Sequence, residues 1–413
     1  MARTSLNIDE IIKTSLENVK ILDRFEYLSL FDALDRVIYD DIFATKDLPA
    51  FDNSAMDGYA VRLSDSGKYT PVIDDSFAGD DLKNYELKDG SCCKIMTGAP
   101  TPAGTEAVVP FENVLDKRDN SIKLPESLKL NANIKFKAEE VSIGDKLISK
   151  GEKLSSNHLA TLASQGISSI RVYKKVKVGV FSTGNEIKEP WEQTSEHQIY
   201  NSNSMGIYSV LKEHNFEAIY LGSLGDDIES IKEGFLIAKS QCDVLVTSGG
   251  ISKGEADFIG DVLELLDAKV LFHGVNVKPG RPNLMALLDD LIFFGLPGNP
   301  LSALVNLNLF VVPAVAKMSG DNRFFIDFIY AKNTQEFKLK DSRANIILGS
   351  YQNGEFKVTR DNRYGSGMLT PLLESNAFIV IEKGVSIVEQ NQSVKIVPFK
   401  ASLTDKNISY LNL

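Results

Sequence analysis

The chain begins with apolar residues at helical spacing and then changes to short strand-like runs. Between residues 8 and about 35 the apolar positions recur three and four residues apart, beginning with Ile8, Ile11, Ile12, Leu16 and Val19. This spacing predicts one or two amphipathic helices. From 51 to about 137, short apolar runs are separated by clusters of Gly, Pro, Asp and Asn, which predicts an all-β insert. Helical spacing returns over about 156–165, so the two flanks of the insert are expected to form one domain.

Strand-like runs and helical stretches alternate beyond residue 175. The strand-like runs are 176–181, 218–221, 243–247, 275–277 and 291–294. Helical spacing lies between and after them, over about 204–214, 227–238, 257–266 and 301–318. Such alternation predicts a parallel sheet covered by helices on both faces. The segment from about 325 to 400 alternates with a period of two and predicts a small β-barrel or sandwich.

The charge of the chain limits its partners. Lys and Arg total 45 and Asp and Glu total 56, which gives a net charge of −11 and a pI near 5.1. A chain this acidic repels phosphate backbones, so we expect no nucleic-acid partner and no membrane partner. A small anionic ligand is compatible with this charge if the cations are gathered locally.

The cysteines and histidines indicate the compartment and exclude one class of enzyme. Cys92, Cys93 and Cys242 form no disulfide framework, which is typical of a reducing compartment. The N-terminus lacks the apolar core of a signal peptide, and no uninterrupted apolar stretch reaches the ~18–20 residues of a membrane helix. We therefore expect a cytoplasmic protein. The four histidines are far apart and have no Cys at zinc-binding spacing, which argues against a zinc enzyme.

Gly-containing turns follow the strand-like runs of the α/β segment. They are Ser182–Glu186, Gly222–Asp227, Ser248–Asp257, Lys278–Pro282 and Leu296–Pro300. The carboxyl ends of parallel strands meet at one edge of the sheet, where ligands bind. Glycine lets the backbone approach a ligand, and the amides of a helix N-terminus bind oxyanions. Each turn alone is more typical of a plain connection or a helix cap, but the five together favour a crevice for a phosphate-like oxyanion.

Carboxylates at the same predicted edge indicate a cation. Glu186, Asp226 and Asp257 offer oxygen ligands beside a bound phosphate, which is the arrangement that Mg²⁺ prefers. The alternative is that Asp226 only caps a helix and Asp257 only begins one.

Two polar strings lie outside the α/β segment. Asp57 follows a dense polar stretch, Asp52–Met56, just before a predicted strand, and Thr97 lies at a strand-to-turn passage. Asp57-Gly58 by itself is typical of an ordinary turn, so neither string alone identifies a site.

The strings together resemble a known family. They are Phe51–Ala60, Ile95–Pro100, Phe181–Glu186, Ile199–Asn203, Ser248–Asp257, Lys278–Pro282 and Leu296–Pro300. They occur in the order seen in the MoeA family, which contains molybdopterin molybdenumtransferases and is similar to the E domain of gephyrin. Tyr364–Gly367 and Glu374–Val380 resemble the closing motifs of that family.

The resemblance implies an α/β plus β fold of several domains. A central parallel α/β sandwich of the molybdopterin-binding type is expected beside an all-β insert domain, an elongated N-terminal domain and a C-terminal small β-barrel. The expected boundaries are 1–50 with 138–175 for the discontinuous N-terminal domain, 51–137 for the insert, 176–320 for the α/β domain and 325–413 for the barrel. The subunit is expected to form a homodimer in which the sheet of one subunit faces the insert of the other across a shared active cleft.

The family inserts molybdate into adenylylated molybdopterin and releases AMP, and the reaction requires Mg²⁺. Molybdate and adenylylated molybdopterin are therefore the expected small-molecule partners. The molybdopterin adenylyltransferase is an expected protein partner. The motifs imply the catalytic residues Asp57, Thr97, Glu186, Asp226 and Lys278. They imply the substrate-binding residues Glu140, Thr183, Gly184, Ser248, Gly249, Gly250, Ser252, Gly280, Arg281, Pro297, Gly298, Asn299, Pro300 and Ser366. The implied metal ligands are Asp226 and Asp257.

This sequence departs from the common family pattern at four positions. The family commonly has Asp where Glu140 stands, Asp where Asn185 stands and Lys where Arg281 stands, and Gly274 occupies a frequently basic position. We therefore expect the affinity for molybdate to depend more strongly on Lys278 and Arg281.

Two other functions remain open at this stage. A related α/β domain transfers adenylyl from ATP onto molybdopterin, but such an enzyme needs no β insert and no Asp57 motif. A non-enzymatic scaffold of the gephyrin kind needs a peptide groove, and it has no use for so many acidic and Gly-rich strand ends on one edge.

Overall fold

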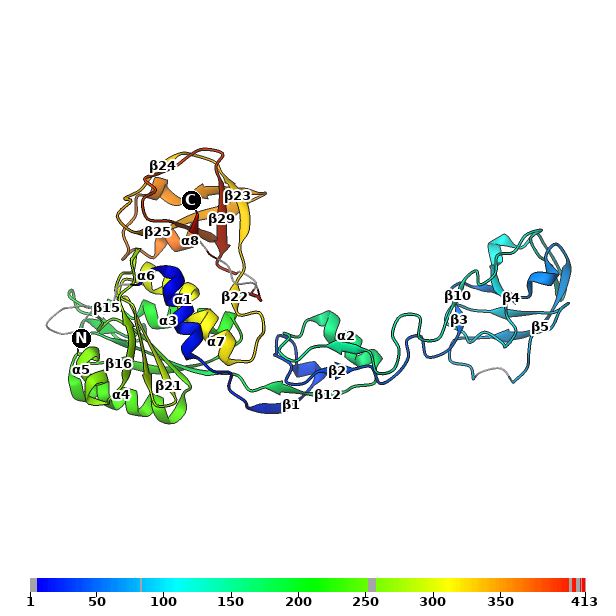
Figure 1. Ribbon diagram of the computed structural model, residues 1–413, viewed down its shortest axis with the longest axis horizontal. Coiled ribbons are helices and arrows are strands. Elements are labelled where there is room, and N and C mark those ends of the chain that lie inside the picture. Colours follow the sequence, from blue (N-terminus) through cyan, green and yellow to red (C-terminus); the bar gives the residue numbers. More distant parts are fainter. Residues whose placement is uncertain are drawn as a thin grey trace. The chain divides into compact units, whose positions relative to one another are not determined.

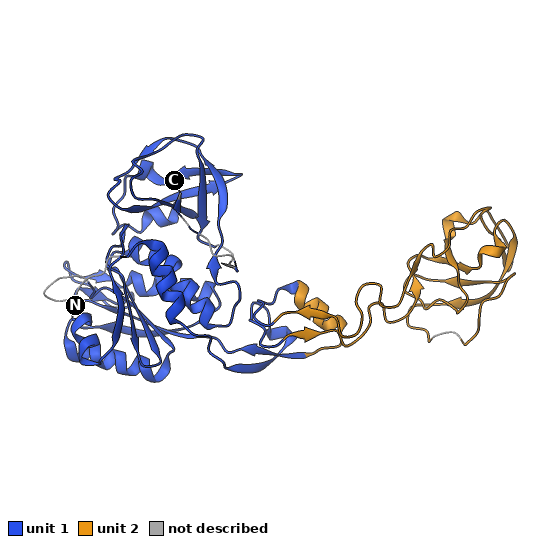
Figure 2. Ribbon diagram, viewed as in Figure 1, with its two compact units in different colours: residues 1–40, 150–156, 169–413 blue, residues 41–149, 157–168 orange. Residues whose placement is uncertain are grey.

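The computed structural model describes residues 6–81, 84–251, 258–400, 403–405, 409 and 411–412. The chain divides into two compact units, coloured separately in Figure 2. The first comprises residues 1–40, 150–156 and 169–413, and the second comprises 41–149 and 157–168.

A six-stranded sheet forms the centre of the first unit (Figure 1). Its strands, in spatial order, are β16 (Glu217–Leu224), β13 (Lys177–Thr183), β17 (Val244–Ser248), β21 (Leu291–Leu296), β20 (Leu284–Leu288) and β18 (Lys269–His273). The first four are parallel, which confirms the predicted α/β fold. The last two run antiparallel to their neighbours, so the sheet is mixed at one side, which the sequence pattern did not predict.

Helices cover both faces of this sheet, because neighbouring strand residues point to opposite sides. Val178 and Val180 of β13 belong to one buried cluster with helices α1 (Ile8–Asn18) and α3 (Ser202–Glu213), while Phe181 joins a second cluster with α4 (Ile228–Gln241) and α5 (Ile259–Leu265). Figure 1 shows these two helical layers on either side of the strands. Burial of a phenylalanine side chain such as Phe181 contributes about 2–3 kcal/mol to the stability of the fold.

Of the one or two α-helices predicted for the N-terminal segment, the structure has one, α1. Asn7 caps α1 in a capping box with Glu10, and the apolar face of α1 is buried against the α/β body. The predicted continuation towards residue 35 is wrong, because Phe25–Ser29 forms strand β1, paired antiparallel with β12 (Ser169–Tyr173). Phe25–Ser29 contains two aromatic residues, Phe25 and Tyr27, which are more frequent in strands than in helices.

The predicted helix over 301–318 is present as a continuous segment. It consists of α6 (Pro300–Asn306), a π-helical turn (Leu307–Val311) and α7 (Val312–Met318). Pro313 has no N–H to donate, and the π-helical turn before it accommodates the missing bond. Within the described residues, this is the helix that is long and apolar enough to cross a membrane, but 89% of the qualifying window is buried inside the protein, as in a core helix.

The predicted C-terminal β-barrel is confirmed. Its five strands close on themselves in the order β25 (Ala344–Gln352), β26 (Glu355–Val358), β23 (Ile329–Asn333), β29 (Ser393–Pro398) and β27 (Ala377–Ile381). The run 275–277, expected in the central sheet, instead leads into the short strand β19 (Val277–Lys278), which pairs in parallel with β25. Strand β31 (Leu411–Asn412) extends the sheet along β27.

The insert in the second unit is a curled six-stranded sheet. Its strands, in spatial order, are β7 (Ala107–Pro110), β4 (Gly58–Val61), β6 (Cys92–Ile95), β5 (Tyr69–Ser76), β9 (Ser121–Lys123) and β8 (Asp116–Arg118). Tyr59 and Val61 enter one buried cluster and Ala60 enters another, so both faces of the sheet are covered.

Short pairs and helices complete the described structure. They are β2 (Ile42–Phe43) with β11 (Lys146–Ile148), β3 (Asn53–Ser54) with β10 (Ile134–Lys135), β14 (Ile187–Lys188) with β15 (Ile199–Tyr200), β22 (Phe325–Ile326) with β30 (Leu403–Thr404), β24 (Phe337–Lys338) with β28 (Ile387–Val388), and helices α2 (Ser156–Ser164) and α8 (Thr370–Leu373).

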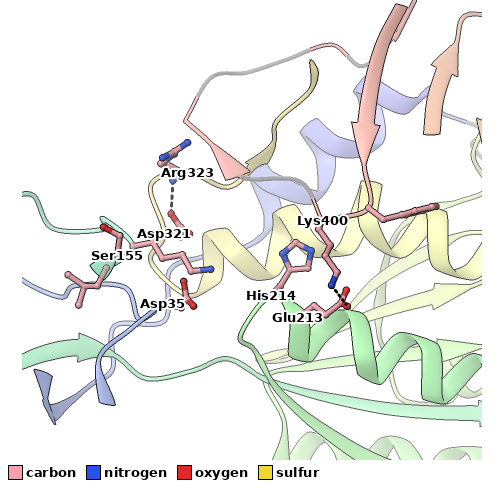
Figure 3. Close-up of a pocket in the computed structure, with 10 residues that line it drawn as sticks. Asp35, Ser155, Glu213, His214, Asp321, Arg323 and Lys400 are labelled. Atoms are coloured by element: carbon pink, nitrogen blue, oxygen red, sulfur yellow. Dashed lines mark hydrogen bonds and ion pairs between the residues drawn. The ribbon is translucent and has the colours of Figure 1, made fainter. Parts of the chain in front are cut away.

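A cavity of 530 Å³ in the first unit has a histidine in its wall (Figure 3). His214 follows the last residue of α3, and its ring stacks on Phe216 with centroids 6.0 Å apart. Burial lowers the pKa of His214 to about 4, and the charge of Lys153 lowers the pKa further, while a hydrogen bond with Asn308 opposes the shift. His214 is therefore neutral in the folded protein at pH 7.

Other charged groups face the same cavity. Glu213 pairs with Lys400 at 3.8 Å, and Asp321 accepts the backbone N–H of Arg323 at 2.8 Å. Figure 3 marks both interactions with dashed lines and shows the Glu213–Lys400 pair next to His214. Burial raises the pKa of Asp321, the opposite direction to the shift of the histidine.

The stability of the protein should depend on the protonation of His214. Its pKa is lower in the folded state than in the unfolded state, so the unfolded chain takes the proton first as the pH falls below 6.5. The wild type should therefore lose about 1–2 kcal/mol more stability than His214→Gln between pH 7 and pH 5, measured by urea unfolding. The raised pKa of Asp321 acts in the opposite direction and is present in both proteins.

His197→Gln is the matched control, since it removes an exposed histidine. This variant should keep the pH dependence of the wild type. Equal pH dependence in His214→Gln and the wild type would contradict the assignment.

Candidate functional site

Four strand ends gather the predicted turns at one edge of the central sheet. Because β16, β13, β17 and β21 are parallel, the segments that follow them begin at the same edge. A cavity of 240 Å³ lies there. The predicted residues that line it are Thr183, Gly184, Glu186, Asp226, Ser248, Gly249, Gly250, Gly298 and Pro300. We call this space the edge cavity.

The Gly-rich turn after β17 packs directly on the end of β13. Gly249 and Gly250 both have positive φ, of 94° and 67°, where a side chain is strained. A Cβ on Gly250 would also lie 2.7 Å from Oγ1 of Thr183. These glycines therefore allow a close approach. Oγ1 of Thr183 is buried without a hydrogen-bond partner among the described residues, so it is a polar atom that a ligand in the edge cavity can satisfy.

Hydrogen bonds join the first two turns across the cavity. The backbone N–H of Asn185 donates to Oδ2 of Asp226 at 3.2 Å, and the backbone N–H of Asp226 donates to Oδ1 of Asn185 at 3.3 Å. Asn185, where the family commonly has Asp, thus accepts a bond without adding charge. The reciprocal pair holds Asp226 in the wall of the cavity.

The donors around the edge cavity fit a hard divalent cation. Glu186 and Asp226 line this cavity with carboxylates, and Thr183, three residues before Glu186 in sequence, lines the same space. Oxygen ligands of this kind suit Mg²⁺, which keeps several waters. In the described part of the chain there is no group of three or more His, Cys, Asp or Glu side chains that could hold a metal. The predicted residues Ser252 and Asp257 lie outside the described residues.

The turn Lys278–Pro282 reaches this edge by a different route from the one predicted. It does not follow a strand of the central sheet but precedes β20, which runs antiparallel and begins with Leu284 opposite Gly295, near the end of β21. Gly280 has a φ of 98°, and a Cβ there would lie 2.0 Å from Nδ2 of Asn306. The carbonyl of Gly280 accepts hydrogen bonds from Nδ2 of Asn306 at 3.1 Å and from Nδ2 of Asn283 at 2.6 Å. Lys278 and Arg281 are exposed.

The turn after β21 contacts the C-terminal region. Nδ2 of Asn299 donates to Oγ of Ser366 at 2.9 Å, so the structure brings these two predicted residues together. The carbonyl of Pro297 accepts the hydroxyl of Ser248 at 3.1 Å, which joins the turn to the end of β17.

Two asparagines hold the site together, and the sequence-based list of site residues omitted both. Asn203 donates from Nδ2 to Oγ of Ser248 and to the carbonyl of Gly298, each at 2.7 Å. Asn201 caps α3 by accepting the N–H of Ser204 at 3.1 Å. Both lie in the string Ile199–Asn203, and their polar spacing at a helix start was the available signal.

The second unit brings Asp57 and Thr97 together. Strands β4 and β6 are antiparallel with Gly58 opposite Ile95, so the residue before β4 lies beside the turn after β6. Oδ1 of Asp57 accepts the N–H of Thr97 at 2.7 Å and its hydroxyl at 2.8 Å. These two bonds lower the pKa of Asp57, so its carboxylate is ionised at pH 7.

Gly58 has a structural role beyond an ordinary turn. A Cβ there would lie 2.1 Å from the carbonyl oxygen of Val109 on the neighbouring strand β7. Glycine is therefore required at position 58, where strands β6, β4 and β7 approach closely. Asp57 lies just before β4, at the edge of this sheet.

Glu140 lies on an exposed segment of the second unit. Its backbone N–H donates to the carbonyl of Leu48 at 2.9 Å, and its side chain is exposed. Nearby, Ala138 has a φ of 61°, a conformation that favours glycine.

Comparison with known proteins matches the chain to three regions of one family. Residues 6–166 match the MoeA N-terminal region (domain I and II), residues 179–317 a probable molybdopterin binding domain, and residues 330–399 the MoeA C-terminal region (domain IV).

Relatives match along almost the whole length. The molybdopterin molybdenumtransferase of Haemophilus influenzae is 37% identical over 400 residues, which cover 95% of this chain and 98% of the relative. That of Bacillus subtilis is 30% identical, with 96% and 94% covered. The crystal structure of a molybdopterin biosynthesis MoeA protein from Pyrococcus horikoshii is 29% identical and superimposes with a TM-score of 0.83, covering 96% of this chain and all of the other. The chain belongs to the MoeA family of molybdopterin molybdenumtransferases.

Proposed function

We propose that the chain inserts molybdenum from molybdate into adenylylated molybdopterin and releases AMP, with the edge cavity as the substrate site. Molybdenum transfer in the synthesis of the molybdenum cofactor is the activity of its family. The observation that supports the site is the convergence of four strand-end turns, two carboxylates and an unpartnered hydroxyl on one cavity. The adenylylated substrate, the cation and the residue roles are proposals.

The Gly-containing turns and two exposed basic residues, Lys278 and Arg281, would bind the anionic substrates. Backbone amides of the Gly-containing turns hold the oxyanions of the substrates. Lys278 and Arg281 lie on the turn that begins β20 and supply positive charge in a chain that is otherwise acidic. Asn203 keeps the two turns at Ser248 and Gly298 at a fixed separation, so the amides are oriented before substrate binds.

Glu186 and Asp226 would hold Mg²⁺, together with Asp257. When bound, the cation would neutralise the carboxylates and the phosphate oxygens that share it. Asn185 positions Asp226 for this role through the reciprocal hydrogen bonds.

Asp57 of a second subunit would orient the water that releases AMP. The oxygen of this water bonds to the adenylyl phosphorus as the bridging P–O bond breaks. AMP leaves, molybdopterin keeps its own phosphate with the bridging oxygen, and the proton of the water passes to that phosphate. The low pKa of Asp57 makes it a weak base, so we assign it the orientation of the water through a hydrogen bond. Thr97 fixes the carboxylate for this role. Bringing both anionic reactants into one water-poor site supplies most of the rate acceleration.

The homodimer with a shared cleft and the cytoplasmic location belong to the same proposal. All three cysteines are free thiols, two of them buried, and this supports a reducing compartment.

Asp57→Ala should slow AMP release by roughly a hundredfold or more while the protein stays folded. The variant removes an exposed carboxylate that two hydrogen bonds hold in place, and loss of an oriented group of this kind costs roughly a hundredfold or more in rate. Release of AMP from adenylylated molybdopterin is measured by chromatography, and folding by circular dichroism.

The matched control is Asp116→Asn in the same sheet, where the carboxylate accepts Tyr69 and the N–H of Lys117. This control should keep the wild-type rate. Turnover of Asp57→Ala at the wild-type rate would refute the role of Asp57.

Asp226→Asn should raise the Mg²⁺ concentration needed for half-maximal activity by about tenfold or more, because it removes one carboxylate ligand. The amide still has an oxygen to accept Asn185, so the turn is retained. Asp227→Asn is the control: Asp227 caps α4 by accepting the N–H of Ser230 at 2.8 Å, and Asn caps equally well. An unchanged Mg²⁺ requirement in Asp226→Asn would remove it from the proposed ligands.

A mixture of two inactive variants should recover activity if the cleft is shared. Asp57→Ala removes the residue that one subunit would contribute to the proposed site. The double variant Glu186→Gln/Asp226→Asn removes the carboxylates that the other subunit would contribute. In an equal mixture after subunit exchange, about a quarter of wild-type activity should return, since half of the dimers have one intact site. An inactive mixture in which mass spectrometry detects heterodimers would show that each site belongs to one subunit.

A further inference from the structure

A second cavity of 310 Å³ adjoins the edge cavity, and its wall is largely aromatic and apolar. The two cavities share Asn201 as a lining residue. The lining residues used below are Glu189, Trp191, Asn201, Met205, Tyr208 and Tyr220. We call this space the aromatic cavity.

Large apolar side chains are unusually exposed around the aromatic cavity. Trp191 is 70% exposed on the segment between β14 and β15, and Met205 is 53% exposed on α3. Tyr208 lies one turn after Met205, on the same side of the helix. Rings and a thioether of this kind pack well against a flat heterocycle.

One end of the aromatic cavity carries a nearly closed hydrogen-bond network. The hydroxyl of Tyr220 donates to Oε1 of Glu189, and Nδ2 of Asn201 donates to the same oxygen and to the Tyr220 oxygen, each at 3.1 Å. Oδ1 of Asn201 is occupied by the N–H of Ser204. Burial and the bond to Glu189 raise the pKa of Tyr220, so its hydroxyl stays a donor.

This network leaves one acceptor for a ligand. Oε2 of Glu189 has no hydrogen-bond partner among the described residues, while both polar atoms of the Asn201 side chain are engaged. The cavity therefore offers a carboxylate oxygen at a polar end and rings along its sides.

We propose that the aromatic cavity binds the pterin ring of the substrate, with Glu189 accepting hydrogen bonds from the amino-pyrimidinone edge of the ring. The inference rests on the proposed function, since the edge cavity then holds the rest of the same molecule. That edge carries adjacent N–H and NH₂ donors, and the two lone pairs of Oε2 can accept a hydrogen bond from each. Trp191 and Tyr208 pack against the ring.

The same chemistry disfavours the adenine of the adenylyl group. Adenine presents one donor beside one acceptor, which matches a free amide better than a carboxylate. Asn201 is the amide in this cavity, and its oxygen and nitrogen are already bonded within the protein.

The sole tryptophan makes the proposal directly measurable, because Trp191 is the only Trp in the chain. Titration of the full-length protein with 6-hydroxymethylpterin should quench tryptophan emission with saturation. Glu189→Gln should weaken this binding about tenfold, because the amide replaces one acceptor by a donor. Glu192→Gln is the matched control: Glu192 accepts the N–H of Glu189 at 2.7 Å through an oxygen that Gln retains, and it is not among the residues that line the cavity.

Adenosine monophosphate and inorganic phosphate are the competing ligands. Neither should quench Trp191 or displace the pterin at equal concentration. Saturable quenching by adenosine monophosphate instead of the pterin would overturn the proposal, as would equal pterin affinity in Glu189→Gln and the wild type. Absence of saturable quenching by the pterin at millimolar concentration would also overturn it.

Failure of this inference is distinguishable from failure of the proposed function. Molybdenum transfer by the wild type, together with absent pterin quenching, would remove only the aromatic cavity as the pterin site. Absence of molybdenum transfer and AMP release in the wild type would remove the proposed function itself, whatever the fluorescence shows.

Discussion

Parallel pairing of β16, β13, β17 and β21 is the constraint on which the site depends. Four parallel strands must end at one edge, and the sheet keeps that direction because its residues are buried on both faces. Reversal of any one strand would carry its turn to the opposite edge. The chemistry of the edge cavity is therefore a consequence of the hydrophobic core below it, although none of the described apolar residues of the two buried clusters lines the cavity.

Pairing alone brings the turns near each other, and side-chain hydrogen bonds then hold them in place. Asn185 and Asp226 join two turns reciprocally, and Asn203 joins two others through Ser248 and Gly298. These asparagines are neutral, so they hold the turns without adding to the negative charge at an anion-binding site. Donors that are already oriented need no reorganisation when charge develops on a substrate, and this is the main source of electrostatic catalysis.

Local pattern predicted much of this architecture, and long-range pairing accounts for what it missed. The strand-to-turn endings at Thr183 and Ser248 were visible because an apolar run meets Gly at each. Strands β18 and β20 were missed because the antiparallel pairing of Leu284–Leu288 with β21 is a tertiary contact, and an apolar run alone does not give its direction. Phe25–Ser29 was assigned to a helix because its partner, β12, lies more than 140 residues further along the chain. Asn203 was omitted because its two partners, Ser248 and Gly298, are distant in sequence.

The edge cavity has negatively charged side chains although its proposed substrates are anions. The chain has a net charge of −11, and Glu186 and Asp226 line a cavity proposed for anionic substrates. Asp57, whose pKa is lowered by two bonds from Thr97, would add another negative charge if it enters the site from a second subunit as proposed. Like charges in a site of low dielectric repel strongly, so the acids alone would oppose binding. Their presence is compatible with anion binding only if cations screen them, and in the proposed site Lys278, Arg281 and a divalent ion would provide that positive charge. Neither the carboxylates nor the cations would therefore support anion binding without the other.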